Sequence, residues 1–299
     1  MPDFSPEILL STVIVAYENP ADVERCLVSI AAVDPALLED LTIVDHSRTD
    51  RCREIAQRFA ARYVSAPNRG FGAGANAGAR LARGRFLFFL NPDAELRSPL
   101  TPAVTGIRYR DHPWAGVARL TDEDSHAHAD SYRLWYFSLE RAFDRLLVHL
   151  RLRRHPVERP LRKLCGGAMI VAHDVFRRVG GFDERFFLYG EDVDLTVRLL
   201  EQGVEPILLE HVTVEHRAGS SGRRAPVPIQ RHQGFSAIYL VGKHRGPLWA
   251  GVAFAELVFV SIAGAVAWAL THRDDRRAGL ARLARISGGT RALLALWRR

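Results

Sequence analysis

The chain has 299 residues, of which 47% are hydrophobic and 25% are charged, which is typical of a globular protein and excludes a disordered or fibrous one. This length accommodates one large α/β domain or two smaller ones. The net charge of +7 favours anionic partners: nucleic acid, phosphorylated small molecules or an acidic membrane surface. Three widely separated cysteines, Cys26, Cys52 and Cys165, lack a metal-binding spacing, so we expect small buried hydrophobes in a reducing cytoplasm.

Strands and helices alternate in the first 90 residues. Apolar segments rich in β-forming residues lie at 9–17, 41–45, 62–66 and 85–90. Segments of helical character lie between them, at about 20–32, 50–61 and 73–83. This alternation predicts βαβ units and a parallel sheet covered on both faces. The N-terminal residues lack the features of a signal peptide, and we expect a first strand there.

Residues 97–163 are less regular. The segment 121–131 reads as a polar loop, and 135–154 as an amphipathic helix that ends in a basic cluster. Regular structure resumes with GGAMIVAHDVFRRVGGFDE at 166–184, and there is no internal repeat.

The segment 247–270 is apolar except for Glu256. As a helix it would be about 36 Å long, enough to cross about 30 Å of hydrocarbon. We expect it to be embedded in the cytoplasmic leaflet without crossing, because crossing would export the Arg-rich tail at 276–299. A charged Glu256 would also cost about 2–3 kcal/mol at the bilayer centre. Spanning the membrane and packing as a soluble helix remain open.

Polar side chains follow each of the four predicted strands. Tyr17 and Glu18 follow the first, Asp45 ends the second, and the third runs into the glycine-rich stretch 66–78. The fourth is followed by NPDAE at 91–95. Because ligands bind beyond the carboxyl ends of strands in open α/β sheets, these residues predict a nucleotide site at one edge.

The glycine-rich stretch is close to a dinucleotide-binding fingerprint, but it follows the third strand. The fingerprint belongs in the first βα turn, which has no glycine here. Tight turns and close helix packing explain Gly74 and Gly78 adequately. An NAD-dependent oxidoreductase is therefore disfavoured.

Two groups of carboxylates predict further parts of the site, a metal-binding site and a general base. Asp93, with Glu95 nearby, suits a hard divalent cation, although a turn that caps a helix explains it equally well. His216 follows a later short strand and could complete a metal site with Asp93. The segment GFDERFFLYGEDVD at 181–194 places five acids among aromatic residues. Acids are favoured in the first turn of a helix in any case, yet a semi-buried one is what a general base for a sugar hydroxyl requires.

Six blocks, in order over about residues 11–222, resemble family 2 inverting glycosyltransferases of the GT-A fold. Within that family they are most similar to the bacterial rhamnosyltransferase-like group that acts on polyprenyl-diphosphate-linked sugars. The blocks are VIVAYENPADVERCLVSI, TIVDHSRTD, APNRGFGAGANAGARLARG, FLFFLNPDAEL, GGAMIVAHDVFRRVGGFDERFFLYGEDVDLTVRLLEQG and VEHRAGSSG.

The resemblance implies a donor site. Asp45 resembles the acid that reads the nucleotide base or ribose, and Tyr17 and Glu18 line the same pocket. Asn76 lies beside the diphosphate, and Arg69 is a candidate phosphate contact.

The resemblance also implies a divalent metal, Mg²⁺ or Mn²⁺. Asp93 matches the last acid of the metal-binding Asp-x-Asp motif, where it also contacts the donor, and His216 matches a ligand from the late loop. Glu95 is a further candidate ligand, because Asn91 stands where the strict motif has Asp. His46 stands where Asn is common.

On the acceptor side, Asp192 matches the catalytic base of the family. Tyr189, Glu191 and Asp194 are expected beside it. The resemblance implies a single displacement at the anomeric carbon with an oxocarbenium-like transition state, and hence inversion.

The expected fold is α/β of the GT-A type, with a mostly parallel central sheet, helices on both faces and C-terminal apolar or amphipathic helices. Residues 1–240 would form the catalytic domain, with a nucleotide-sugar half at 1–96 and an acceptor half at 97–240. Residues 241–299 would form membrane-associating helices.

The expected function is transfer of a sugar from a nucleotide-diphosphate donor to a lipid-linked or glycan acceptor in cell-envelope polysaccharide synthesis. The lead donor is dTDP-rhamnose, and galactofuranose or mannose donors are alternatives. The site would lie at the cytoplasmic face of the plasma membrane, with peripheral or monotopic attachment. A nucleic-acid-binding protein is disfavoured, because the excess positive charge lies beside apolar helices at 141–163 and 217–299. The oligomeric state stays open.

Overall fold

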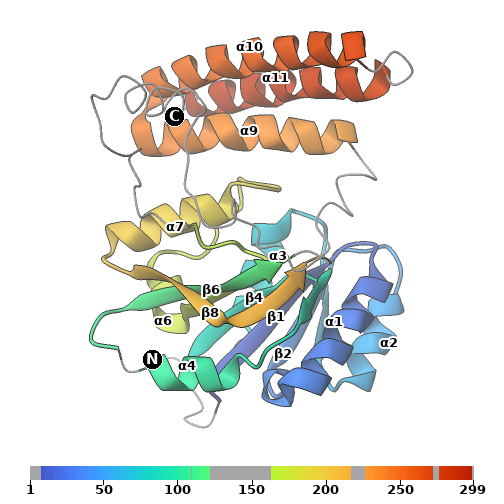
Figure 1. The fold of residues 1–299 in the computed structure, drawn as a ribbon, viewed down its shortest axis with the longest axis vertical. Helices are drawn as coiled ribbons and strands as arrows, with labels where there is room; N and C mark the ends of the chain where they lie inside the picture. Colours follow the sequence, from blue (N-terminus) through green and yellow to red (C-terminus); the bar gives the residue numbers. More distant parts are fainter. Residues whose placement is uncertain (1–7, 109, 122–162, 217–225, 272–275, 298–299) are drawn as a thin grey trace. The chain divides into compact units, whose positions relative to one another are not determined.

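The computed structural model describes residues 8–108, 110–121, 163–216, 226–271 and 276–297 (Figure 1). The described residues form two compact units. The first comprises 8–108, 110–121, 163–185 and 192–216, and the second comprises 186–191, 226–271 and 276–297. The predicted helix at 135–154, and the predicted loop at 121–131 beyond its first residue, lie outside the described residues.

The first unit is an α/β structure. Its elements, in chain order, are β1 (Leu10–Ala16), α1 (Pro20–Val33), the 3-10 helix η1 (Pro35–Leu38), β2 (Leu41–Asp45), α2 (Arg51–Arg58), β3 (Arg62–Ser65), α3 (Phe71–Ala79), β4 (Phe86–Leu90), β5 (Ala94–Leu96), α4 (Thr101–Ile107), β6 (Trp114–Thr121), β7 (Ala168–Ala172), α6 (His173–Arg178), α7 (Glu191–Glu201, its first residue counted with the second unit) and β8 (Glu205–His216).

These strands form one eight-stranded sheet in the order β3-β2-β1-β4-β7-β6-β8-β5. The predicted parallel arrangement of the first four strands is confirmed, since β1 pairs in parallel with β2 and β4, and β2 with β3. Beyond β4 the sheet is mixed: β7 is antiparallel to β4 and β6, β8 is parallel to β6, and β5 is antiparallel to β8. Only β7 and β5 therefore run against the direction of the other strands.

Strand β4 shows why the run RFLFFL lacks alternation. Phe86, Phe88 and Leu90 pack into the hydrophobic core on one face of the sheet, and Leu87 and Phe89 pack into the core on the other. All five side chains are buried. Each stabilises the fold by about 1.5–3 kcal/mol relative to an exposed position, so both faces of the sheet must be covered.

Helix α3 lies close against strand β1. A Cβ atom at Gly74 would lie 2.7 Å from Val15 Cγ1 and from His46 Nε2, and one at Gly78 would meet the side chain of Val13. The prediction that these glycines serve close helix packing is confirmed.

A buried carboxylate joins elements at the amino ends of the parallel strands. Asp40 accepts hydrogen bonds from Ser11 Oγ and from the backbone N–H of Arg83, and it pairs with Arg62 Nη2 at 2.9 Å. Burial alone would raise the pKa of Asp40, but the hydrogen bonds from Ser11, Arg83 and Arg62 outweigh burial and lower it. Asp40 therefore stabilises the fold in its ionised form.

The second unit contains three long helices, α9 (Pro226–Arg245), α10 (Pro247–Thr271) and α11 (Arg276–Trp297). Helix α11 packs against both α9 and α10, and small residues allow the closest approach: Cβ atoms at Gly234 and Gly288 would collide with the facing backbone. The predicted domain boundary at 240/241 falls inside α9, which groups with the C-terminal helices and not with the sheet. The continuous helical hydrogen bonding of α9 explains the difference.

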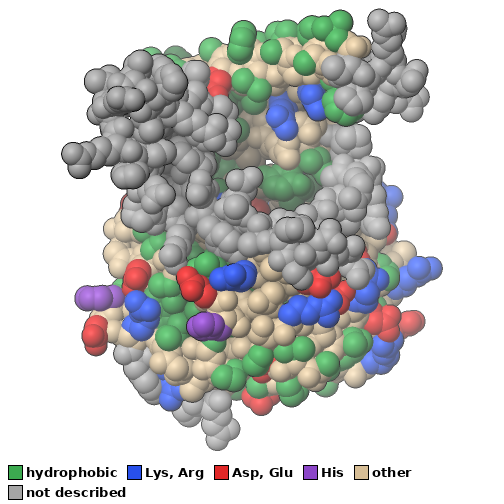
Figure 2. Space-filling view, in the orientation of Figure 1, with side chains coloured by type: hydrophobic (Ala, Val, Ile, Leu, Met, Phe, Trp, Pro, Cys, Tyr) green, Lys and Arg blue, Asp and Glu red, His purple; other side chains and the backbone are tan. Residues whose placement is uncertain are grey.

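Helix α10 exposes an apolar surface. Figure 2 shows hydrophobic side chains along this helix. Within the described residues, Pro247–Leu270 is the one helix long and apolar enough to cross a membrane. In its most apolar stretch of 18 residues, 17% of the residues are buried inside the protein. The large exposed side chains of α10 are Leu248, Trp249, Val252, Phe259, Val260, Ile262, Val266 and Leu270.

Candidate active site

The carboxyl ends of β1 to β4 lie at one edge of the sheet, as predicted. Ala16 pairs with Asp45, Asp45 pairs with Ser65, and Leu90 pairs with Ile14 near the end of β1. The polar residues that follow these strands are therefore gathered at this edge.

Asp45 is fully buried, and both of its oxygens accept hydrogen bonds. The backbone N–H of Ser47 donates to Oδ1 at 2.9 Å, and the Tyr63 hydroxyl donates to Oδ2 at 3.1 Å. Burial and the Asp45 carboxylate raise the pKa of Tyr63, so the phenol remains a donor at neutral pH. The carboxylate is thus rigidly oriented at the end of β2.

Tyr17 and Glu18 form the adjoining loop. Glu18 has a left-handed backbone (φ 53°), its N–H donates to Ser47 Oγ at 2.7 Å, and its Oε1 accepts from the N–H of Arg48 at 3.1 Å. These bonds join the loops after β1 and β2. Tyr17 is 55% exposed beside them, so its ring offers a flat apolar surface to a ligand.

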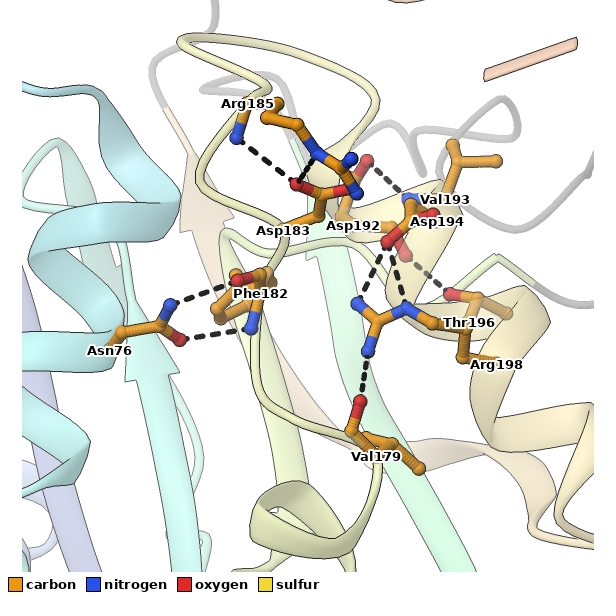
Figure 3. Close-up of polar contacts among 10 residues, drawn as sticks. All are labelled: Asn76, Val179, Phe182, Asp183, Arg185, Asp192, Val193, Asp194, Thr196 and Arg198. Atoms are coloured by element: carbon orange, nitrogen blue, oxygen red, sulfur yellow. Dashed lines mark hydrogen bonds and ion pairs between the residues drawn. The ribbon is translucent and has the colours of Figure 1, made fainter. Parts of the chain in front are cut away.

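Asn76 has a role that sequence reasoning missed. Its Nδ2 donates to the carbonyl of Phe182 at 2.9 Å, and its Oδ1 accepts from the N–H of Phe182 at 2.9 Å (Figure 3). The amide also donates to Glu184 Oε1 at 3.2 Å. Asn76 therefore clamps the segment before α7 onto α3, and its predicted place beside the diphosphate stays a prediction. Arg69, 3.5 Å from Glu184 Oε2, is mostly exposed at the same edge.

Asp93 and His216 are brought together although 123 residues separate them. Asp93 Oδ1 lies 3.1 Å from His216 Nε2, and Asn91 Nδ2 lies 3.1 Å from the same nitrogen. A carboxylate and an imidazole form a donor pair that suits a divalent cation such as Mn²⁺.

Glu95 lies beside arginine residues. Its Oε2 lies 2.8 Å from Arg97 Nη2, and the same guanidinium pairs with Glu215 at 2.9 Å. Among the described residues no three His, Cys, Asp or Glu side chains form a group that could hold a metal ion. Arginine compensates the charge of Glu95, and its predicted role as a metal ligand stays a prediction.

Asp192, in the first turn of α7, is held through both oxygens. Its Oδ2 lies 2.9 Å from Lys163 Nζ and 3.4 Å from the N–H of Gly166, and its Oδ1 accepts from the N–H of Val193 at 2.8 Å. Thr196 Oγ1 donates to the Asp192 carbonyl at 2.7 Å. The carboxylate is nine-tenths buried and restricted to one orientation.

Lys163 is the second residue that sequence reasoning missed. It follows Arg162 in the sequence, and the charge of these two residues alone suggests a solvated or membrane-facing surface. No local pattern distinguishes it from Arg162, so only the folded chain identifies it as the ion-pair partner of Asp192.

A short path of contacts joins the base to the Asp93–His216 pair. Gly166 donates to Asp192, and its neighbour Gly167 accepts from the N–H of Asn91 at 3.0 Å. A Cβ atom at Gly167 would lie 3.2 Å from Asn91 Nδ2, the atom that faces His216. The acid of α7 and the residues after β4 therefore belong to one site.

The other acids of this segment differ in role. Asp194 is fully buried and pairs with Arg198 at 2.8 Å, and Arg198 Nη1 donates to the Val179 carbonyl at 2.6 Å (Figure 3). Asp194 and Arg198 thus form a buried i,i+4 ion pair within α7, and the predicted place of Asp194 on the acceptor side stays a prediction. Tyr189, which is 40% exposed, and Glu191, which is buried, belong to the second unit.

The chain is similar in sequence to known glycosyltransferases. Residues 11–128 match the model of glycosyl transferase family 2, and residues 148–226 match a model described as the N-terminal domain of galactosyltransferase. The chain is 39% identical over 95 residues to the N-acetylglucosaminyl-diphospho-decaprenol L-rhamnosyltransferase of Mycobacterium tuberculosis (strain ATCC 25618 / H37Rv), a match that covers 31% of either chain. It is 25% identical over 210 residues to Rhamnosyltransferase WbbL of Escherichia coli (strain K12), covering 64% of this chain and 77% of that one.

A solved structure shows the fold. The mannosyltransferase PcManGT from Pyrobaculum calidifontis, in complex with GDP-Man and Mn²⁺, aligns with a TM-score of 0.53 at 15% identity, over 97% of this chain and 89% of that one. The fold is that of the GT-A glycosyltransferases.

Proposed function

We propose that the chain is an inverting, metal-dependent glycosyltransferase that moves a sugar from a nucleoside-diphosphate donor to an acceptor hydroxyl. The observation that carries this proposal is the contact path from the fixed Asp192 carboxylate, through Gly166 and Gly167, to the Asp93–His216 pair. A base and a cation-binding pair in one site are the two groups that a single displacement requires.

Asp192 is the base in this proposal. It takes the proton of the acceptor hydroxyl while the acceptor oxygen bonds to the anomeric carbon and the bond to the diphosphate oxygen breaks. Lys163 and the N–H of Gly166 hold Oδ2 in place, so the carboxylate needs no reorientation during the reaction. One displacement inverts the anomeric carbon, and no covalent enzyme intermediate forms.

Asp93 and His216 would hold the divalent cation. When bound, such a cation neutralises the negative charge on the departing nucleoside diphosphate. The GDP-Man and Mn²⁺ in the solved mannosyltransferase support this part of the proposal.

The donor lies, in this proposal, over the edge formed by β1 and β2. The rigid Asp45 carboxylate accepts hydrogen bonds from the base or ribose, and the exposed Tyr17 ring packs on the nucleoside, with Glu18 bracing the loop. Arg69, which lies just before α3 and 3.5 Å from Glu184 Oε2, contacts the donor phosphates in this proposal.

For the donor sugar we propose L-rhamnose from dTDP-rhamnose, and for the acceptor a lipid-linked N-acetylglucosamine. The names of the mycobacterial and Escherichia coli relatives support this choice. Galactofuranose and mannose donors are the alternatives. The chain spans only 31% of the length of the mycobacterial relative, so substrate identity has to be measured.

A screen of nucleotide sugars by thermal shift, with and without Mn²⁺, tests the donor. A ligand at 100 times its Kd stabilises the folded chain by about 2.7 kcal/mol, enough for a clear shift. We expect dTDP-rhamnose with Mn²⁺ to give the largest shift, followed by transfer of radiolabelled sugar to a lipid-linked acceptor. If no nucleotide sugar shifts the melting temperature or donates its label, the proposed function is wrong.

We further propose that α10 lies embedded in the cytoplasmic leaflet of the plasma membrane. Its exposed apolar side chains, among them Phe259 at 73% exposure, support this placement, as do the basic residues Lys243, His244 and Arg245 just before it. A reporter fused after Arg299 tests it. Alkaline phosphatase activity in the periplasm would contradict the embedded arrangement, and recovery without detergent would contradict membrane attachment.

A further inference from the structure

The segment 186–191 leads directly into Asp192, yet its contacts group it with the three C-terminal helices. We infer that helix α9 is a positioning element for the acceptor side of the active site, acting through its hold on this segment. The inference rests on the proposed function, since it assigns a role next to the proposed base. It adds a task for the helical unit besides membrane attachment.

Two aromatic contacts anchor the start of the segment on α9. Phe186 is fully buried and meets Tyr239 edge to face, with ring centroids 5.1 Å apart, and Tyr239 in turn stacks on Phe235 at 5.3 Å. The next residue, Phe187, stacks on His232 at 4.3 Å with an interplanar angle of 18°. Such aromatic pairs contribute beyond the area they bury, and their geometry restricts the backbone that carries them.

Polar and steric contacts anchor the end of the segment. Ser236 Oγ donates to the carbonyl of Leu188 at 3.2 Å. Gly190 has φ 87°, and a Cβ atom there would lie 3.1 Å from Ser236 Cβ and 3.2 Å from the Phe186 ring. Only glycine therefore combines this backbone conformation with such a close approach to α9.

The residues of α9 that hold the segment lie on one stripe of the helix. His232, Ser236, Tyr239 and Lys243 are separated by four, three and four positions, the spacing of one helical face, and Lys243 Nζ lies 6.0 Å from the Phe186 ring centroid. Gly242, outside this stripe, packs against Leu296 of α11. One face of α9 thus contacts the segment 186–191, and a different face packs against α11.

This arrangement ties the residues before the base to the unit that we propose to bind the membrane. Between the two anchors, Tyr189 has φ 66° and its side chain is 40% exposed. A non-glycine residue in this conformation persists only where its surroundings enforce it. Helix α9 therefore fixes the backbone of the segment that contains Tyr189, a predicted acceptor-side residue, within the unit that we propose to bind the membrane.

The test compares three variants of the full chain. Tyr239→Leu removes the ring beneath Phe186, Ser236→Ala removes the hydrogen bond to Leu188, and Leu296→Ala is the control, since it loosens packing on α9 away from the segment. We expect Tyr239→Leu to lower kcat for transfer by about 10- to 100-fold, the scale of a small misplacement of reacting groups, with the KM for donor unchanged. Ser236→Ala should lower kcat by about 3- to 10-fold.

Hydrogen exchange of the 186–191 amides provides a second readout that does not depend on activity. We expect faster exchange in Tyr239→Leu and no change in Leu296→Ala. Unchanged exchange in Tyr239→Leu would overturn the anchoring, and faster exchange with wild-type kcat would overturn the positioning role. An equal loss of kcat in Leu296→Ala would also overturn it, because the effect would then be general destabilisation. If the wild-type chain transfers no sugar from any donor, the proposed function and the positioning role fall together, while exchange still decides the anchoring.

Discussion

Replacing Asp192 by asparagine removes the proposed base and keeps its shape. In the native site, Oδ1 accepts from the N–H of Val193 at 2.8 Å, and Oδ2 faces Lys163 Nζ at 2.9 Å. Both partners are donors, so the NH₂ group of an asparagine must face a donor in either orientation. We therefore expect Asp192→Asn to lose some stability as well as its activity.

The two losses have different sizes. A general base contributes typically about 10²–10⁴-fold to the rate, so kcat should fall by that factor. Loss of a hydrogen bond to a charged group costs about 1.5–3 kcal/mol. The Asp192 side chain is only 10% exposed, so solvent screens this loss little. At about 2–4 °C per kcal/mol the melting temperature should fall by several degrees, which leaves the chain folded at assay temperature.

The assay measures initial transfer rates at saturating acceptor, together with donor affinity by calorimetry. Donor affinity should be nearly unchanged in Asp192→Asn, because the base contacts the acceptor. Asp174→Asn is the matched control: this carboxylate pairs with Arg178 on α6, and both side chains are more than half exposed. An exposed pair of this kind contributes about 0–1 kcal/mol, so the control should retain wild-type rate and stability.

Wild-type turnover of Asp192→Asn at saturating acceptor would show that the base is another residue. A fall in donor affinity as large as the fall in kcat would show that the substitution disturbs the whole site, and the rate loss could not then be assigned to proton transfer.

Three further predictions concern the same molecule. Lys163→Met should lower kcat with the KM for donor unchanged, and Lys163→Arg should restore most of it by preserving the charge beside Asp192; equal loss in both would refute a role for the charge. Asp93→Ala and His216→Ala should each raise the Mn²⁺ concentration required for half-maximal activity, and activity that survives excess EDTA would remove the metal from the mechanism. The lowered pKa of Asp40 means that its stabilisation is present above the unfolded pKa, near 3.8, and is lost as the pH falls through the folded value. Urea unfolding should therefore find Asp40→Asn less stable by about 1–3 kcal/mol at pH 7, with the difference shrinking below about pH 4, and a pH-independent difference would contradict this account.

Much of the nucleotide-sugar half could be predicted from the sequence. A buried parallel strand can be identified from a short, uninterrupted apolar run such as 85–90. The alternation of such runs with helical segments predicts the parallel arrangement of β1 to β4, which the structure contains. Because parallel strands end at a common edge, the residues that follow them were predictable site residues. Asp45 and Asp93 lie where this reasoning puts them.

Partnerships across long sequence separations were decided by the tertiary structure. Asn76 clamps Phe182 from 106 residues away, and Asn91 approaches His216 across 125 residues. The first contact involves the chain that follows β7, which lies antiparallel beside β4, and the second involves β8, where His216 pairs with Ala94 of β5. The sequence of a strand does not show which distant strand it will pair with, because the same residues could pair with a different strand.

The sequence by itself determined which residue types are available for the chemistry, namely the acids after β4 and at the start of α7. Only the folded chain decided which charges they meet. Glu95 is compensated by Arg97, Asp194 by Arg198 and Asp192 by Lys163. A carboxylate's role depends on burial and on the nearest opposite charge, and both are properties of three-dimensional distance, which the order of residues along the chain does not specify.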